Sequence, residues 1–149
     1  MQRDPSAMTS AELRCLRESL GLSIAELAAV LGLDARAAAP GPDEPALAGS
    51  ARKASPLDRK TINRWERDLQ PISKANAEAL NRLVVYTDRA VAAIVDEHEP
   101  GQPIITYADS VELHAAESGL WATLPAAWHR AVAWRAAQQI PGATISYSS

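Results

Sequence analysis

The sequence predicts a mostly α-helical protein, with an N-terminal bundle of four to five helices and a small C-terminal α+β module. Apolar residues recur at helical spacing through residues 9–99, and a stretch rich in Ala, Pro and Gly interrupts them over residues 34–54. Within residues 100–149 the pattern changes, because short β-branched runs flank helical segments. We therefore expect two domains, 9–99 and 100–149, with 34–54 as a long flexible insertion in a turn of the first.

The first helix is predicted from its caps and its apolar stripe. Either Thr9 or Ser10 can cap a helix from Ala11 to Leu20, because both side chains accept hydrogen bonds from backbone N–H groups. Gly21 is expected to end it. Its leucines are spaced three and four residues apart, as in a core-facing stripe, at Leu13, Leu16 and Leu20.

A second and a long later helix are predicted in the same way. Ser23 precedes a helix from Ile24 to Leu31, with Glu26 at the spacing of a capping box and Gly32 as its end. Ser73 is expected to cap the long helix. The apolar residues of this long helix are Ala77, Leu80, Leu83, Val84, Val91 and Ile94.

The most informative segment runs from Ser55 to Arg67. A helix here places Ile62 and Trp65 on one apolar face. From Arg52 to Arg67 there are six basic and two acidic residues, a local charge of +4 in a chain of net charge −3. A solvated surface helix has the same pattern. Because two short capped helices precede it, we favour the interpretation that this helix reads DNA.

The polar face of this helix has side chains suited to DNA. Arginine carries the forked donor that suits guanine, and asparagine suits adenine, so Arg59 and Asn63 are expected at base edges. Lys60 is expected at guanine or phosphate, Thr61 at phosphate or a thymine methyl group, and the last two arginines at the backbone. The expected contacts from this helix are Arg59, Lys60, Thr61, Asn63, Arg64 and Arg67.

The insertion has two possible roles. Arg52 and Lys53 lie just before the helix, where they could contact the DNA backbone or minor groove, but a long surface insertion is also tolerated without any role. A different register, with the DNA-reading helix at Asp34–Ala39, is rejected because it offers one basic residue and is cut short at Pro40.

Several of these segments together resemble the Xre or lambda-repressor-like helix-turn-helix family. They are Ala11–Ser23, Ala25–Ala28 and Thr61–Arg67 with the following Pro71-Ile72, so the likeness covers roughly the first 85 residues. More narrowly, the pattern over Trp121–Ala137 looks like YdiL-type regulators, including anti-CRISPR-associated autorepressors with a small dimerisation domain. The resemblance implies a helix-turn-helix DNA-binding domain and a homodimeric (auto)repressor that binds an inverted repeat.

Two features depart from the family pattern. Ile24 stands where such proteins usually have a Gln that touches DNA, so the second helix is expected to contribute less to binding. The turn before the DNA-reading helix is also far longer than usual.

The C-terminal segment predicts a strand at Ile104–Tyr107, a short helix capped by Asp109, a helix from Pro125 to Gln139 and a strand at Ala143–Tyr147. The two strands are expected to pair with each other or across a twofold axis. Either pairing would bury tryptophans, so we expect a dimerisation module. Its predicted interface residues are Trp121, Trp128, Val132 and Trp134.

Composition limits the function further. Residues 1–83 hold 12 basic and 11 acidic residues, and residues 84–149 hold 3 and 7, so the acidic C-terminal part is not expected at DNA. The sequence contains no recognisable nucleophile, metal or cofactor motif, so we expect no enzyme, metal or cofactor. Without an apolar run near the roughly 20 residues of a membrane span, we expect no membrane partner and a cytoplasmic location. The alternative is an antitoxin-type regulator whose C-terminal half binds a partner protein.

Overall fold

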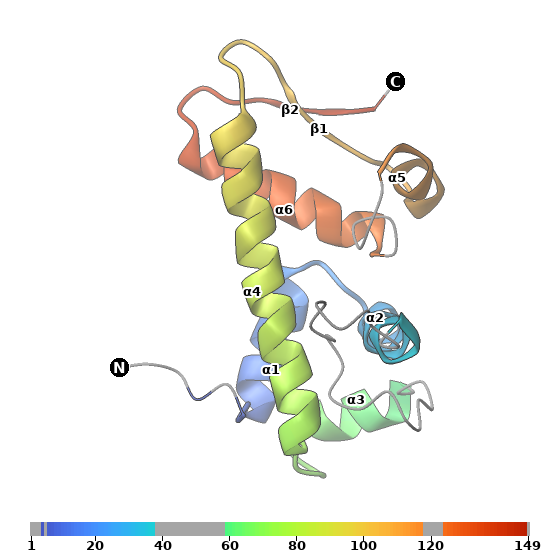
Figure 1. Ribbon diagram of the computed structural model, residues 1–149. Helices are drawn as coiled ribbons and strands as arrows, with labels where there is room; N and C mark the ends of the chain where they lie inside the picture. The colour runs from blue at the N-terminus through green and yellow to red at the C-terminus, as the bar shows by residue number, and fades with distance from the viewer. Residues whose placement is uncertain (1–3, 5, 38–58, 118–123, 149) are drawn as a thin grey trace. The chain divides into compact units, whose positions relative to one another are not determined.

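Two compact units make up the chain. The computed structural model describes residue 4 and residues 6–37, 59–117 and 124–148. These residues form six helices and two short strands, and the chain divides into Met1–Val85 and Tyr86–Ser149 (Figure 1). The prediction of a mostly α-helical protein with a small β component is therefore confirmed.

The division between the units differs from the predicted one. It falls between Val85 and Tyr86, inside the long helix α4 (Lys74–Glu97), and not at residues 99 and 100. The reason is packing, because the second half of α4 supplies partners to the C-terminal elements. One of these partners is Thr87, whose hydroxyl accepts a hydrogen bond from the Trp128 indole at 3.0 Å.

Helix α1 (Ser10–Ser19) begins as predicted, and Thr9 is its N-cap. The Thr9 hydroxyl accepts from the Glu12 backbone N–H at 3.1 Å, and the Glu12 carboxylate accepts from the Thr9 N–H at 2.9 Å. This reciprocal pair is a capping box. Gly21 follows the helix with φ +67°, a conformation that glycine adopts without the steric cost of a Cβ.

Helix α2 (Ile24–Ala37) begins as predicted but runs past its expected end. Ser23 and Glu26 form the predicted capping box, with both hydrogen bonds at 3.0 Å. The prediction that Gly32 ends the helix is wrong. One glycine costs a helix only about 1 kcal/mol, and the residues after it include good helix formers. Residues 34–37 are therefore helical, and the rest of the expected insertion, 38–54, lies outside the described residues.

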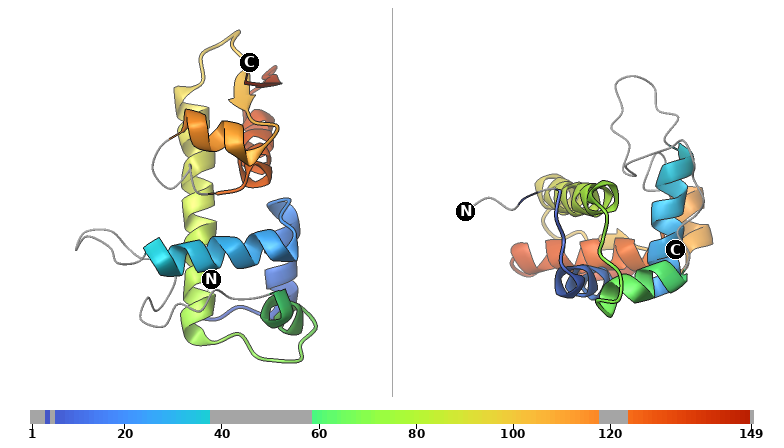
Figure 2. Two further views of the ribbon diagram at one scale, coloured as in Figure 1. Left: turned by 90° about the vertical axis from the view of Figure 1, so that its right-hand side faces the viewer. Right: turned by 90° about the horizontal axis from the view of Figure 1, so that it is seen from below.

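The core of the N-terminal unit joins α1, α2, α3 (Arg59–Glu66) and the first half of α4. Figure 2 shows α3 beside α1 and α2, and residue contacts join α3 to both helices. Ser73 caps α4 as predicted, and its hydroxyl accepts from the Asn76 N–H at 3.2 Å. The largest fully buried side chains here are Trp65, Leu13, Leu20, Leu27, Val30, Ile62, Leu80 and Leu83.

The C-terminal unit contains a two-stranded parallel sheet of β1 (Ile104–Thr106) and β2 (Ile145–Tyr147). Of the two pairings left open, the structure has the strands of one chain pairing with each other. The register places Ile104 opposite Ile145. Parallel strands need a long crossover, which here contains α5 (Ser110–Ala116) and α6 (Ala126–Gln139).

Helix α6 provides the centre of this unit. Trp128, Val132 and Ala136 are fully buried on one stripe, as their spacing predicts. The Trp128 ring also stacks on Tyr86, with ring centroids 5.8 Å apart. Trp128 and Val132 are therefore core residues of a single chain, which corrects their predicted place at a dimer interface. Trp134 is 61% exposed.

Asp109 caps α5 as predicted, since its carboxylate accepts from the Glu112 N–H at 2.9 Å. The predicted interface residue Trp121 lies outside the described residues. None of the described helices is both long and apolar enough to cross a membrane.

Candidate nucleic-acid interface

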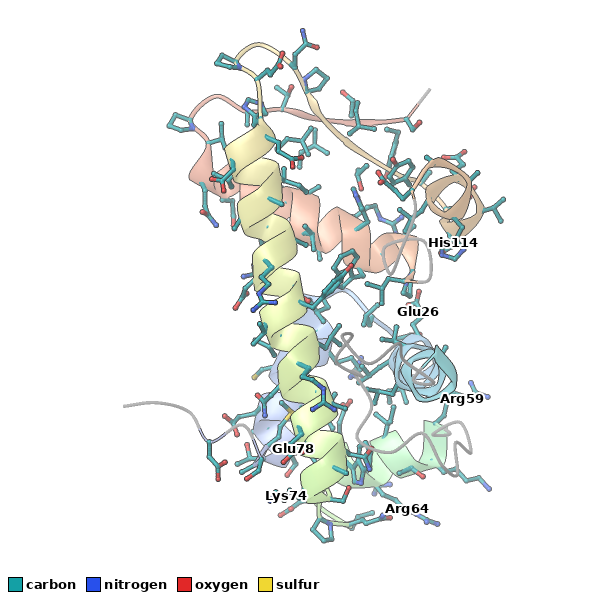
Figure 3. All side chains as sticks on the ribbon, viewed as in Figure 1. Glu26, Arg59, Arg64, Lys74, Glu78 and His114 are labelled. Carbon is teal, nitrogen blue, oxygen red and sulfur yellow. The ribbon has the colours of Figure 1, made fainter. Side chains whose placement is uncertain are left out.

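Helix α3 has one buried face and one exposed, basic face. Ile62 is fully buried and Trp65 is 2% exposed, so these two side chains hold the helix in the unit. Figure 3 shows Arg59 and Arg64 projecting outward from α3. The exposed residues of the helix and of the position just after it are Arg59, Lys60, Asn63, Arg64 and Arg67. Four of these five side chains are cationic, so this surface attracts polyanions.

The position of α3 against α1 is set by an ion pair. The Arg17 guanidinium donates to both carboxylate oxygens of Glu66, at 2.6 and 2.9 Å. Both side chains are largely shielded from water, at 14% and 5% exposed. Hydrogen bonding to Glu66 raises the pKa of Arg17, so the guanidinium stays charged. A forked pair of this kind fixes orientation as well as distance.

Arg17 also connects the turn between α1 and α2 to this pair. Its guanidinium donates to the Leu22 carbonyl at 3.0 Å. One arginine therefore links the end of α1, the following turn and the last residue of α3. Removing it would leave a nearly buried Glu66 carboxylate without its cation, which is costly.

The chain leaves α3 through a tight helix-ending turn. The Asp68 N–H donates to the Trp65 carbonyl at 3.2 Å, and the Leu69 N–H donates to the Arg64 carbonyl at 2.9 Å. Asp68 has φ +58°, the left-handed conformation that such a turn requires. The turn places Leu69 at 65% exposure immediately beside the basic surface.

Most of the predicted DNA contacts lie together on one surface. The exposed residues of α3 share that surface, but Thr61 is only partly exposed and offers less of its side chain. Ile24, where the family pattern has a polar contact, is half-buried at the start of α2. Arg52 and Lys53 lie outside the described residues.

The three histidines have structural partners. The His98 ring lies 2.9 Å from the Gln102 carbonyl and the His114 ring 2.9 Å from the Leu124 carbonyl. His129 is 2% exposed, and its Nδ1 lies 2.8 Å from the Thr106 hydroxyl. In the described part of the chain, no three His, Cys, Asp or Glu side chains converge as a metal site would need.

Sequence reasoning missed the Arg17–Glu66 pair. The two residues are 49 positions apart, so no helical or strand periodicity relates them. The available signal was the Trp65-Glu66 pair itself, since an acidic residue directly after a core tryptophan lies near the edge of the core, where a shielded carboxylate requires a cation.

Comparison with known proteins found no relative of this chain. No protein-family model matches the chain, and no curated protein matches it.

Proposed function

We propose that this protein is a sequence-specific DNA-binding transcriptional regulator of the Xre-like helix-turn-helix type, acting as a homodimeric (auto)repressor. The observation that carries the proposal is the division of α3 into two faces. Ile62 and Trp65 anchor it in the core, and its cationic side chains point to solvent. A short helix held in this way can enter the major groove without leaving the domain.

In this mechanism the first turn of α3 meets the bases. Arg59 stands at its N-terminal end, where the forked guanidinium suits the O6 and N7 atoms of guanine. Asn63 lies one turn further along and suits adenine. Lys60, Arg64 and Arg67 neutralise phosphates, which supplies affinity that depends on salt. The Arg17–Glu66 pair holds the helix at one angle, so the contacts form without a further ordering cost.

The proposed homodimer uses exposed surface of the C-terminal unit. Its exposed large hydrophobic side chains come from both strands and both shorter helices, and a second copy is the partner we propose for them. They are Ile105, Val111, Trp134 and Tyr147. A twofold dimer would prefer an inverted repeat with half-sites about one helical turn apart.

Selection from random DNA tests this function. The full chain at physiological salt is expected to enrich an inverted repeat with defined spacing. Asn63→Ala should lose the preferred base at one position of each half-site. Arg89→Ala removes an exposed arginine of the C-terminal half of α4 and should leave the enriched sequence unchanged. Recovery of no preferred sequence from the unaltered chain would refute the proposal.

A second candidate is an antitoxin-type regulator that binds a partner protein through its C-terminal half. The observation that favours it is the same set of exposed apolar side chains, in a half that carries 3 basic and 7 acidic residues from residue 84 onward. Sedimentation of the purified chain separates the two. A stable homodimer supports the first candidate, and a monomer that still selects one half-site favours the second.

A further inference from the structure

The C-terminal unit contains a cavity that the proposed DNA-binding surface does not use. Its volume is about 580 Å³, within the usual range for small-molecule sites. The end of α4, the turn that follows it, β1, Glu117 and His129 form its lining. All of these described lining residues belong to one unit of a single chain. We call it the acidic cavity.

The lining combines apolar walls with carboxylates. Ile94 and Ile104 provide aliphatic surface, and Glu97, Glu99 and Glu117 provide negative charge. None of the described residues that line it is Lys or Arg. Within the described part of the chain, no ion pair joins any of these three carboxylates to a basic side chain. The acidic cavity therefore carries three carboxylates without a basic partner among the described residues, and of these Glu97 and Glu99 are exposed and Glu117 is partly buried.

The helix end that lines the cavity increases this imbalance. The C-terminus of a helix carries partial negative charge, and basic residues normally stabilise it. The last turn of α4 has no basic residue, and instead contains Asp96 and Glu97. Glu97, in this last turn, also lines the cavity, so the negative end of the helix lies where it would attract a bound cation.

Part of the wall is held in place by its own hydrogen bonds. The buried His129 ring is bonded to the Thr106 hydroxyl at 2.8 Å, and Glu117 accepts from the Tyr107 hydroxyl at 2.7 Å. His98 is bonded to the Gln102 carbonyl at 2.9 Å. Polar groups held in this way do not have to be ordered when a ligand enters.

We propose that the acidic cavity binds a small organic cation, an amine or guanidinium carried on a short aliphatic chain. The carboxylates suit the charged group, and the isoleucines suit the chain. A metal ion fits less well, because no three acidic or imidazole side chains of the described residues converge on one point. This site is separate from α3, so it does not depend on the proposed DNA binding.

Calorimetric titration of the full chain with agmatine, without DNA, tests the proposal. Agmatine carries a guanidinium and an amine on a short aliphatic chain. Saturable binding at one site per chain is expected, with a dissociation constant of about 0.1 mM or tighter. Butylurea, a neutral compound of similar shape to one end of agmatine, should not bind.

Variants locate the binding. Glu97→Gln combined with Glu117→Gln should weaken agmatine binding by about tenfold or more, because it removes two charges of the cavity with little change of shape. Asp96→Asn is the matched control, since Asp96 is exposed beside Glu97 but does not line the cavity. The proposal is overturned by absence of binding, by equal binding of butylurea, by displacement of agmatine by equimolar magnesium, or by equal losses in the two variants.

Discussion

The two units each have a tryptophan at their centre, but they use it differently. Trp128 donates its indole N–H to Thr87, stacks on Tyr86 and meets the His129 ring edge-on at 6.3 Å. The Trp65 indole nitrogen is buried with no hydrogen-bond partner among the described residues. The N-terminal unit instead has its strong polar connection beside Trp65, in the pair between Arg17 and Glu66.

The two units are therefore stabilised by different interactions. In the N-terminal unit, apolar side chains and one charged pair hold the exposed helix α3 in place. In the C-terminal unit, neutral hydrogen bonds and ring contacts lie at the centre, and the charged side chains lie at the surface and at the acidic cavity. The two units should therefore respond differently to core mutation, charge removal and pH.

The largest expected effect comes from shortening the Trp65 side chain. Trp65→Phe keeps an aromatic anchor and leaves no hydrogen-bonding group of the described residues newly unsatisfied. Trp65→Ala should instead destabilise its unit by about 3–5 kcal/mol, because it creates a large cavity. Urea unfolding followed by NMR signals from each unit measures both variants. Similar losses for Trp65→Phe and Trp65→Ala would show that Trp65 does not anchor α3 by its volume.

Removing the buried cation should have the next largest effect. Arg17→Ala is expected to cost the N-terminal unit about 3 kcal/mol, because Glu66 then stays nearly buried without its partner. Arg14→Ala is the matched control in the same helix. It breaks an exposed pair with Glu18, whose side chains are 65% and 58% exposed, and should cost about 0.5 kcal/mol or less. Equal losses from the two variants in urea unfolding would contradict the assigned role of Arg17.

In DNA binding, the two ends of α3 are expected to have different roles, with base contacts at its start and phosphate contacts at its end. Arg59→Ala should cost about 1–3 kcal/mol at one base position, whereas Arg67→Ala should weaken all sequences alike and reduce the salt slope by about one. Binding isotherms on the selected site and on random DNA, over a salt series, measure both effects. If each variant lost the same binding free energy on the selected site as on random DNA, the two arginines would not have these different roles.

A smaller effect should distinguish the units by pH, since the described N-terminal residues include no histidine. Burial lowers the pKa of His129 below its ordinary 6.5. As the pH falls through about 6.5, the unfolded chain takes up this proton before the folded one. The C-terminal unit therefore has its full stability above this pH and loses part of it on acidification toward the lower, folded-state pKa.

Thermal unfolding at a series of pH values from about 7.5 to about 5.5 measures this loss. His129→Gln should reduce the slope, because glutamine does not titrate in this range. His114→Gln serves as the control, since His114 is exposed and its ring is bonded to the Leu124 carbonyl. An unchanged slope in His129→Gln would assign the pH dependence to other groups.

Local sequence signals predicted the starts of the helices well. Thr9, Ser23, Ser73 and Asp109 each cap the helix expected after them, because a cap and its partner lie within three residues of each other. The same locality explains the error at Gly32. A glycine signals an end only when the residues beyond it favour another conformation, and here they continue α2.

Contacts between distant residues could not be predicted in this way. The Arg17–Glu66 pair and the Trp128–Thr87 bond join residues 49 and 41 positions apart. Their formation depends on the tertiary arrangement, which a helical period does not encode. The same limit explains why the interface prediction for Trp128 and Val132 was wrong. An apolar stripe on a helix does not specify whether the same chain or a second copy covers it.

Helix α4 has a consequence for how this protein can be divided. Because its first half belongs to one unit and its second half to the other, no connecting loop separates two independent modules. A fragment that starts at residue 100 would lack Tyr86, Thr87 and Asp88, and with them the stacking, hydrogen-bonding and ionic partners of α6. In evolutionary terms, an exchange of either unit between genes that keeps both sets of contacts would have its crossover near the middle of this helix, between Val85 and Tyr86.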